Sequence, residues 1–139
     1  METPNLSGLA AEASAENEAI TVPLRNRSGE PYLTGSGQPV TISVLGIYSE
    51  PARKAQDATL RRWSKQRTAQ WTPEMALANR ISVAVAGLVG WNFEDAEHQP
   101  IPFTPENAQR VFLIAPWILE QVEQAMQGHA DFFGANAKP

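Results

Sequence analysis

Two groups of side chains have residue types and spacings that could do chemistry, and the first lies in an acidic stretch around one histidine. His98 is close in sequence to Glu94, Asp95 and Glu97, and an imidazole together with carboxylates can bind a metal ion. A protein metal site usually needs three or four well-placed ligands that are held by further hydrogen bonds. A solvated acidic loop is the simpler interpretation of this stretch, so we expect it to bind no metal.

The second group is a pair of carboxylates, Glu120 and Glu123, three residues apart on one face of an expected helix. A general acid or base needs burial or a like-charged neighbour to shift its pKa, and the sequence indicates neither here. The chain has no cysteine, which excludes disulfides, thiolate metal ligands and a cysteine nucleophile. It also lacks the glycine-rich motifs that bind phosphates and the Gly-x-Ser-x-Gly motif of serine hydrolases. We therefore expect no enzyme activity and no cofactor.

Basic residues gather in residues 50–67, where six basic and two acidic side chains give a net charge of +4. Tryptophans lie within and just after this segment, and Trp and Arg often supply the central contacts of protein interfaces. The simplest interpretation is a solvated helix face whose arginines pair with acidic neighbours. Docking to a protein and binding of nucleic acid are the alternatives. The candidate partner-binding residues are Arg53, Arg61, Arg62, Trp63, Arg67 and Trp71.

The rest of the chain is acidic, with a net charge of −3 over residues 1–49 and −5 over residues 68–139. The overall charge of −4 argues against a general nucleic-acid-binding protein. A basic segment between acidic ones favours attraction between copies, so we expect self-association or docking to an acidic partner. No apolar run reaches the roughly 20 residues that span a bilayer. The first residues lack the features of a signal peptide, so we expect a cytoplasmic protein without membrane contact.

A chain of 139 residues fits one domain, and the sequence predicts a mainly α (α+β) fold with four to five helices and a small N-terminal β-hairpin. We expect a flexible tail over residues 1–19, one domain over residues 20–133 and a frayed end over residues 134–139. A short amphipathic helix that orders on binding is the alternative for the tail. Alternation in residues 20–24 and 40–48 predicts the hairpin strands, joined by a long, mobile connection rich in glycine and proline.

Serine or threonine followed by proline marks most of the helix starts. The expected helices run from Ser49 to about residue 70, from Thr72 to Gly90, from Thr104 to Ala115 and from Pro116 to Gly128. The second is apolar on nearly all faces, which predicts a buried central helix. The first has only a narrow apolar stripe, which is formed by Ala52, Ala55, Leu60 and Trp63. One core is expected to contain Ile81, Val85, Leu88, Trp91, Phe103, Val111, Phe112, Trp117, Ile118 and Val122.

The stretch from residue 89 to residue 122 combines several distinctive short elements. They are Val89-Gly90-Trp91-Asn92-Phe93, Pro100-Ile101-Pro102-Phe103-Thr104-Pro105-Glu106-Asn107-Ala108, and Pro116-Trp117-Ile118 with Gln121-Val122. With the preceding strand that ends in Leu-Gly and the basic helix after it, this combination resembles the tail assembly chaperones of long-tailed bacteriophages. The resemblance covers residues 20–133.

The resemblance implies a non-enzymatic protein in the cytoplasm of the bacterial host. Such chaperones bind the tape-measure protein, keep it soluble and help the tail-tube protein gather on it. One alternative is a structural tail or head-completion protein, which would be found in purified virions. Another is a small nucleic-acid-binding regulator, which would bind DNA in a salt-dependent way.

Overall fold

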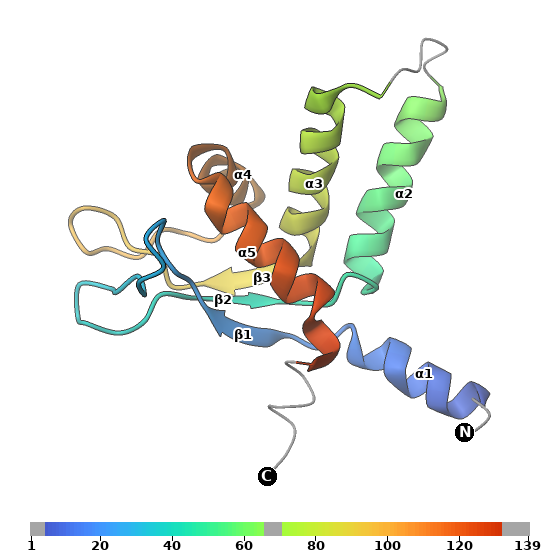
Figure 1. Cartoon of the computed structure of the whole chain (residues 1–139), viewed down its shortest axis with the longest axis horizontal. Helices are drawn as coiled ribbons and strands as arrows, with labels where there is room; N and C mark the ends of the chain where they lie inside the picture. The colour runs from blue at the N-terminus through green and yellow to red at the C-terminus, as the bar shows by residue number, and fades with distance from the viewer. Residues whose placement is uncertain (1–4, 66–70, 132–139) are drawn as a thin grey trace.

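A computed structural model describes residues 5–65 and 71–131, and it confirms the mainly α, α+β fold that the sequence predicts. Residues 1–4, 66–70 and 132–139 are outside the description. In chain order the elements are α1 (Leu6–Ala15), β1 (Ile20–Pro23), β2 (Thr41–Val44), α2 (Glu50–Ser64), α3 (Pro73–Gly87), β3 (Leu88–Trp91), α4 (Pro105–Ile114) and α5 (Pro116–Gln127). Helices α4 and α5 lie over the sheet, whereas α2 and α3 project away from it side by side (Figure 1).

The sheet is antiparallel, with β2 between β1 and β3. Ile20 and Val22 of β1 pair with Val44 and Ile42 of β2, and all four side chains are buried. The positions between them are polar or proline and are more exposed. One face of the sheet therefore belongs to the core and the other meets solvent, as is common for antiparallel sheets.

Helix α5 packs on β2, and α3 and α4 pack beside α5. Half of the predicted core residues are buried, namely Ile81, Leu88, Phe112, Ile118 and Val122. Others are partly buried against this core, namely Val85, Trp91, Val111 and Trp117. Phe103 is more exposed than predicted, because its ring packs edge-on against Trp91, with centroids 5.0 Å apart, at the rim of the core.

The second predicted helix ends earlier than expected. Helix α3 stops at Gly87, and residues 88–91 form β3, so the predicted helix end at Gly90 is wrong. Pairing of β3 with β2 satisfies backbone groups that a longer helix would have satisfied internally. The prediction that this helix is buried on all faces is also wrong for its first half. Leu77 there is 40% exposed, because this half extends away from the sheet alongside α2 (Figure 1).

The buried face of α2 differs by one position from the predicted stripe. Ala52 and Thr59 are buried, and Ala55 and Trp63 are partly buried, at spacings of three and four residues. Leu60 was expected on this stripe but is exposed, because each residue turns the helix by about 100° and Thr59 takes the inward position.

Three turns with the same hydrogen-bond pattern project from the sheet. The sequence had indicated only turn-forming composition in two of them and an acidic loop in the third. Each is closed by a backbone bridge between its first residue and a proline six residues later. In each, a side-chain oxygen of the second residue accepts a hydrogen bond from the backbone N–H four residues on. The turns are Arg25–Pro31, Leu33–Pro39 and Glu94–Pro100, and their acceptors are Asn26, Thr34 and Asp95.

The fifth residue of each turn has a positive φ. In the first two turns this residue is glycine, Gly29 and Gly37, and both have φ of 84°. In the third turn it is His98, with φ of 61°, the single non-glycine residue with positive φ in the described part of the chain. In all three turns the backbone N–H of the second residue donates a hydrogen bond to the carbonyl of the sixth. Two of these tight turns make up the connection between β1 and β2.

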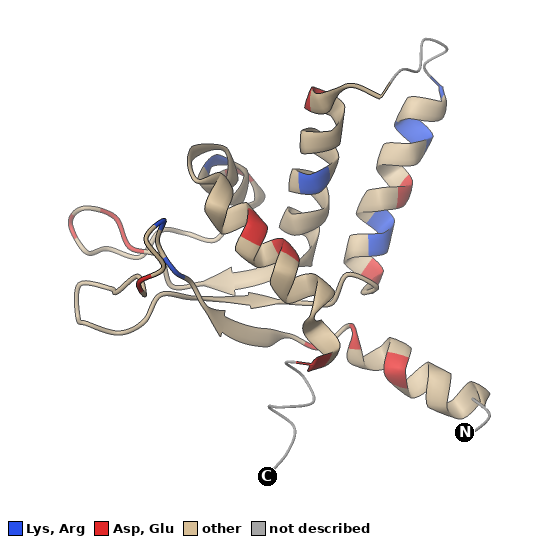
Figure 2. Cartoon of the chain, viewed as in Figure 1, with Lys and Arg blue, Asp and Glu red and all other residues tan. Residues whose placement is uncertain are grey.

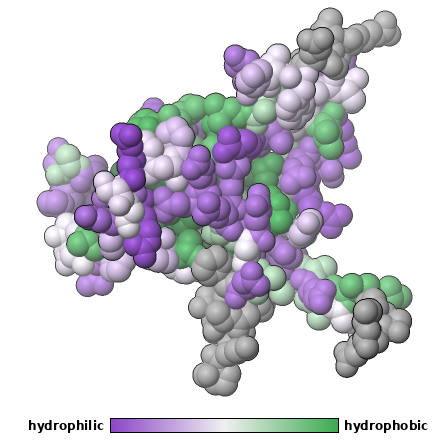
Figure 3. Space-filling model, in the orientation of Figure 1, coloured by the Kyte–Doolittle hydropathy of each residue, from purple (hydrophilic) through white to green (hydrophobic). Residues whose placement is uncertain are grey.

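The N-terminal segment forms a ten-residue helix where the sequence favoured a flexible tail. None of the residues of α1 is buried, and apolar surface is visible along it (Figure 3, green at the lower right). The described residues before β1 carry acidic side chains, drawn red in Figure 2, and no basic ones.

The chain just after α1 is attached to the body by three hydrogen bonds. The carbonyl of Glu16 accepts from the N–H of Gly46 (2.9 Å), and the carbonyl of Glu18 accepts from Nε2 of the buried His129 (2.6 Å). Asn17 Oδ1 accepts from the N–H of Glu50 (2.8 Å), the first residue of α2. Asn17 therefore caps α2. The sequence predicted Ser49 as the cap, but its buried hydroxyl has no hydrogen-bond partner among the described residues.

Candidate partner-binding surface

The structure brings most of the predicted partner-binding residues to the free end of the α2–α3 pair. Arg61, Arg62 and Trp63 lie in the last turn of α2, and Trp71 lies just before α3. Arg53 is not part of this group, because eight residues of helix separate it from Arg61, about 12 Å at 1.5 Å per residue. Arg67 lies outside the described residues.

The two tryptophans contact each other across the end of the pair. Their ring centroids are 3.8 Å apart and the ring planes meet at 85°, an edge-to-face arrangement. Trp63 is half-buried, whereas Trp71 remains 53% exposed. The pair thus holds the helix ends together and still offers aromatic surface to a partner.

The cations near this end are available for contact. Lys54 forms an ion pair with Glu50 (3.1 Å), but no ion pair of Arg53, Arg61 or Arg62 occurs within the described ranges. The expectation that the arginines pair with acidic neighbours is therefore not met for these three. The basic residues are the blue bands on α2 in Figure 2.

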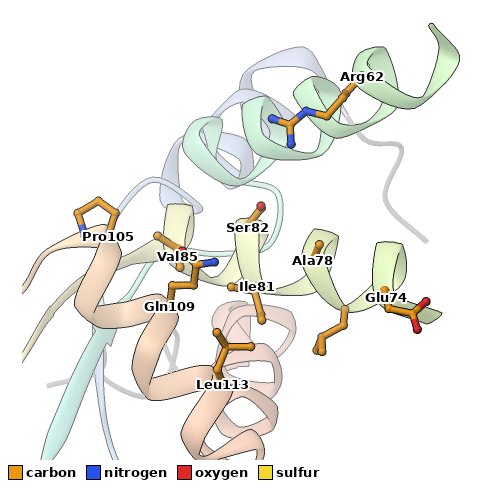
Figure 4. A pocket seen from close by; sticks show the side chains of 10 residues that line it. Arg62, Glu74, Ala78, Ile81, Ser82, Val85, Pro105, Gln109 and Leu113 are labelled. Carbon is orange, nitrogen blue, oxygen red and sulfur yellow. The ribbon is translucent and has the colours of Figure 1, made fainter. Parts of the chain in front are cut away.

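An apolar groove of about 510 Å³ runs beside this end. Helix α3 forms its floor, α2 lies on one side with Arg62, and α4 lies on the other with Leu113 (Figure 4). The floor residues recur at spacings of three and four along α3, namely Glu74, Leu77, Ala78, Ile81, Ser82 and Val85. Such a stripe is the surface against which the apolar face of another helix packs.

The groove is open to solvent. Leu77 is 40% and Leu113 is 56% exposed, and Val85 is only half-buried. Of the predicted site residues that the structure describes, Arg62 alone lines this groove. The other lining residues were not predicted, because α3 was expected to be buried on nearly all faces. The sequence did indicate an exposed apolar surface, because a helix that is apolar on all faces has more apolar surface than one small core can cover.

Three of the acidic residues considered for chemistry, Glu94, Asp95 and Glu123, form structural hydrogen bonds. Asp95 holds its turn, and Glu94 accepts a hydrogen bond from the N–H of Gly35 (2.7 Å) in the neighbouring turn. Glu123 was expected to be solvated, but it forms two hydrogen bonds with Arg80 (2.9 and 2.7 Å) that join α5 to α3. The hydrogen bonds that Arg80 donates to Glu123 raise the pKa of Arg80 above its ordinary value. Residues 5–65 and 71–131 contain no group of three or more potential metal ligands.

Comparisons with protein-family models, with curated proteins and with solved structures give no match for this chain. Nor does any helix within the described ranges have the length and apolar character needed to cross a bilayer.

Proposed function

We propose that this chain is a tail assembly chaperone of a long-tailed bacteriophage, acting in the cytoplasm of the bacterial host. Its ligand is an apolar helical segment of the tape-measure protein, and it promotes the gathering of the tail-tube protein on that segment. The proposal rests on the resemblance of residues 20–133 to such chaperones. The observation that carries it further is the open apolar groove along α3.

The groove suits a ligand of this class for a physical reason. An amphipathic helix binds by laying residues at spacings of three and four into an apolar groove. Burial of one leucine from such a helix contributes about 1.5–3 kcal/mol, so a few contacts give useful affinity. Trp71 is exposed, and Arg61 and Arg62 form no ion pair with any other described residue; these three side chains extend the surface at the end of the groove.

Co-expression with the tape-measure protein of the phage or prophage that carries this gene tests the proposal. The tagged chain should retain the tape-measure protein in pull-down and keep it soluble on size-exclusion chromatography. Leu113→Glu places a charge in the groove without touching the core and should weaken capture by at least about tenfold.

Leu33→Glu is the matched control, because Leu33 is a similarly exposed leucine on a turn outside the groove. It should bind like the unaltered protein. If the unaltered protein does not retain the tape-measure protein, the proposed function is wrong. If Leu113→Glu binds as tightly as Leu33→Glu, the tape measure uses another surface.

A further inference from the structure

Helix α1 has an apolar stripe that nothing in the described part of the chain covers. Leu6, Leu9, Ala10 and Ala13 follow the spacing of one helix face. Leu6 is 85% and Leu9 is 49% exposed. Isolated helices shorter than about 12–15 residues are marginal in water, so a ten-residue helix is expected to gain its stability from packing.

The apolar groove and α1 of the same chain are held apart. The hydrogen bonds of Glu16, Asn17 and Glu18 fix the end of α1 near the start of α2 and the end of α5. The groove lies between α3 and α4, and α1 points away from them (Figure 1). For α1 to enter its own groove, these bonds would have to break, whereas α1 of a second copy can enter without breaking them.

The two surfaces match in length. The ten residues of α1 span about 15 Å, and the groove floor from Glu74 to Val85 spans about 16 Å. They also match in charge. Glu12 borders the apolar stripe of α1, and the described residues before β1 carry three acidic and no basic side chains. Arg62 borders the groove on the α2 side, next to Arg61, whereas Glu74 lies at one end of the floor, so the match in charge is with the α2 side of the groove.

We propose that α1 of one copy lies in the groove between α3 and α4 of a second copy, with Glu12 facing Arg62. The contact joins two different surfaces, so it is head-to-tail and can be repeated from copy to copy. In terms of the proposed function, which this inference extends, α1 occupies the groove until an apolar helix of the tape measure replaces it. Self-association then depends on α1 and the groove.

Complementation between two variants tests the contact in the purified chain, without any tape-measure protein. Leu9→Glu alters α1 and leaves the groove intact, whereas Leu113→Glu alters the groove and leaves α1 intact. Both leucines are exposed, so neither change disturbs the core. Sedimentation velocity should show that the mass of the unaltered protein rises with concentration. Each variant alone should need an at least tenfold higher concentration to associate.

An equal mixture of the two variants should form a one-to-one dimer and nothing larger, because only one working α1 and one working groove remain in each pair. A second test concerns the charges: Arg62→Glu alone should weaken self-association, and adding Glu12→Arg to the same chain should restore it. Leu33→Glu should associate like the unaltered protein.

The inference is overturned if the unaltered protein stays monomeric at every concentration, if both leucine variants associate normally, or if their mixture stays monomeric. These outcomes are independent of the proposed function. Leu9→Glu keeps its groove, so its capture of the tape-measure protein tests that function whether or not copies associate. Failure of capture with intact self-association would reject the function alone.

Discussion

The indole rings of Trp63 and Trp71 meet edge to face at the free end of the α2–α3 pair, with their centroids 3.8 Å apart. Both residues had been expected to contact a partner, yet each is the other's partner in the structure. The contact closes the end of a pair of helices that the sheet and α5 do not support there (Figure 1).

Trp71→Ala should therefore loosen the end of the helix pair without unfolding the domain. An aromatic pair of this kind contributes about 0.5–1.5 kcal/mol beyond the area that it buries. Hydrogen exchange should become faster in the last turn of α2 and the first turn of α3, and remain unchanged in β2 and α5. Uniformly faster exchange would mean instead that the pair supports the whole core.

The Arg80–Glu123 pair should stabilise the fold modestly. A double-mutant cycle with Arg80→Ala and Glu123→Ala is expected to give a coupling free energy of about 0.5–1 kcal/mol, at the upper end for solvent-exposed pairs. The more exposed Lys54–Glu50 pair on α2 is the control, with an expected coupling of about 0.3 kcal/mol. Equal coupling in the two cycles would show that the two-bond geometry adds nothing.

The pH dependence of this pair follows from the raised pKa of Arg80. A folded pKa above the unfolded one means that the arginine's contribution is fully present below the unfolded pKa. It is lost only as the pH rises through the folded pKa, far above neutrality. Between pH 6 and about pH 9, the contribution of Arg80 measured by urea denaturation should therefore stay constant.

At the fifth position of the three related turns, replacing glycine should destabilise the fold and introducing glycine should stabilise it. Gly37→Ala should lower the free energy of unfolding by about 1 kcal/mol, through backbone strain alone, because no atom lies within 4 Å of the added methyl position. His98→Gly should raise it by up to about 1 kcal/mol, since His98 occupies the equivalent position with φ of 61°. Urea denaturation measures both. The His98 ring lies where a Cβ on Gly35 would point, and a destabilised His98→Gly would show that this packing outweighs the strain.

Gly46→Ala should loosen the attachment of the N-terminal segment. A methyl group at this position would overlap the carboxylate of Glu16, which lies against Gly46 and 4.0 Å from Nδ1 of His129. Glu16 must then move, and amide exchange of α1 should become faster while that of the sheet stays slow. Unchanged exchange in α1 would mean that the hydrogen bonds of Asn17 and Glu18 hold the segment without Glu16.

Local signals predicted much of this fold. Thr72-Pro73 and Thr104-Pro105 start helices as predicted, and both threonine side chains accept the expected capping bonds. These signals lie within four residues of the structure that they specify. The third strand was missed because Leu88 continues the helical spacing of α3, and only its pairing with Val44, far away in sequence, makes it a strand.

The relation among the three turns was missed for a different reason. Their common feature is an oxygen acceptor at the second residue, a positive φ at the fifth and a proline at the seventh. Three residue types, Asn26, Thr34 and Asp95, act as the acceptor, and His98 replaces glycine in the third turn. The same backbone conformation is thus specified by different residue types, and a search for repeated residues does not detect it. The groove was missed because sequence shows that α3 is apolar but not which of its faces the core covers.

Asn17 caps α2 from outside the helix, and this hydrogen bond joins the N-terminal segment directly to the first residue of α2. A force on α1 acts on the bond between Asn17 and Glu50 as well as on those of Glu16 and Glu18. The 15 residues of α2 then carry the strain about 22 Å to the pair of tryptophans at the far end. In a row of copies, tension on α1 in one contact would thus reach the far end of α2, which borders the groove that holds α1 of the next copy.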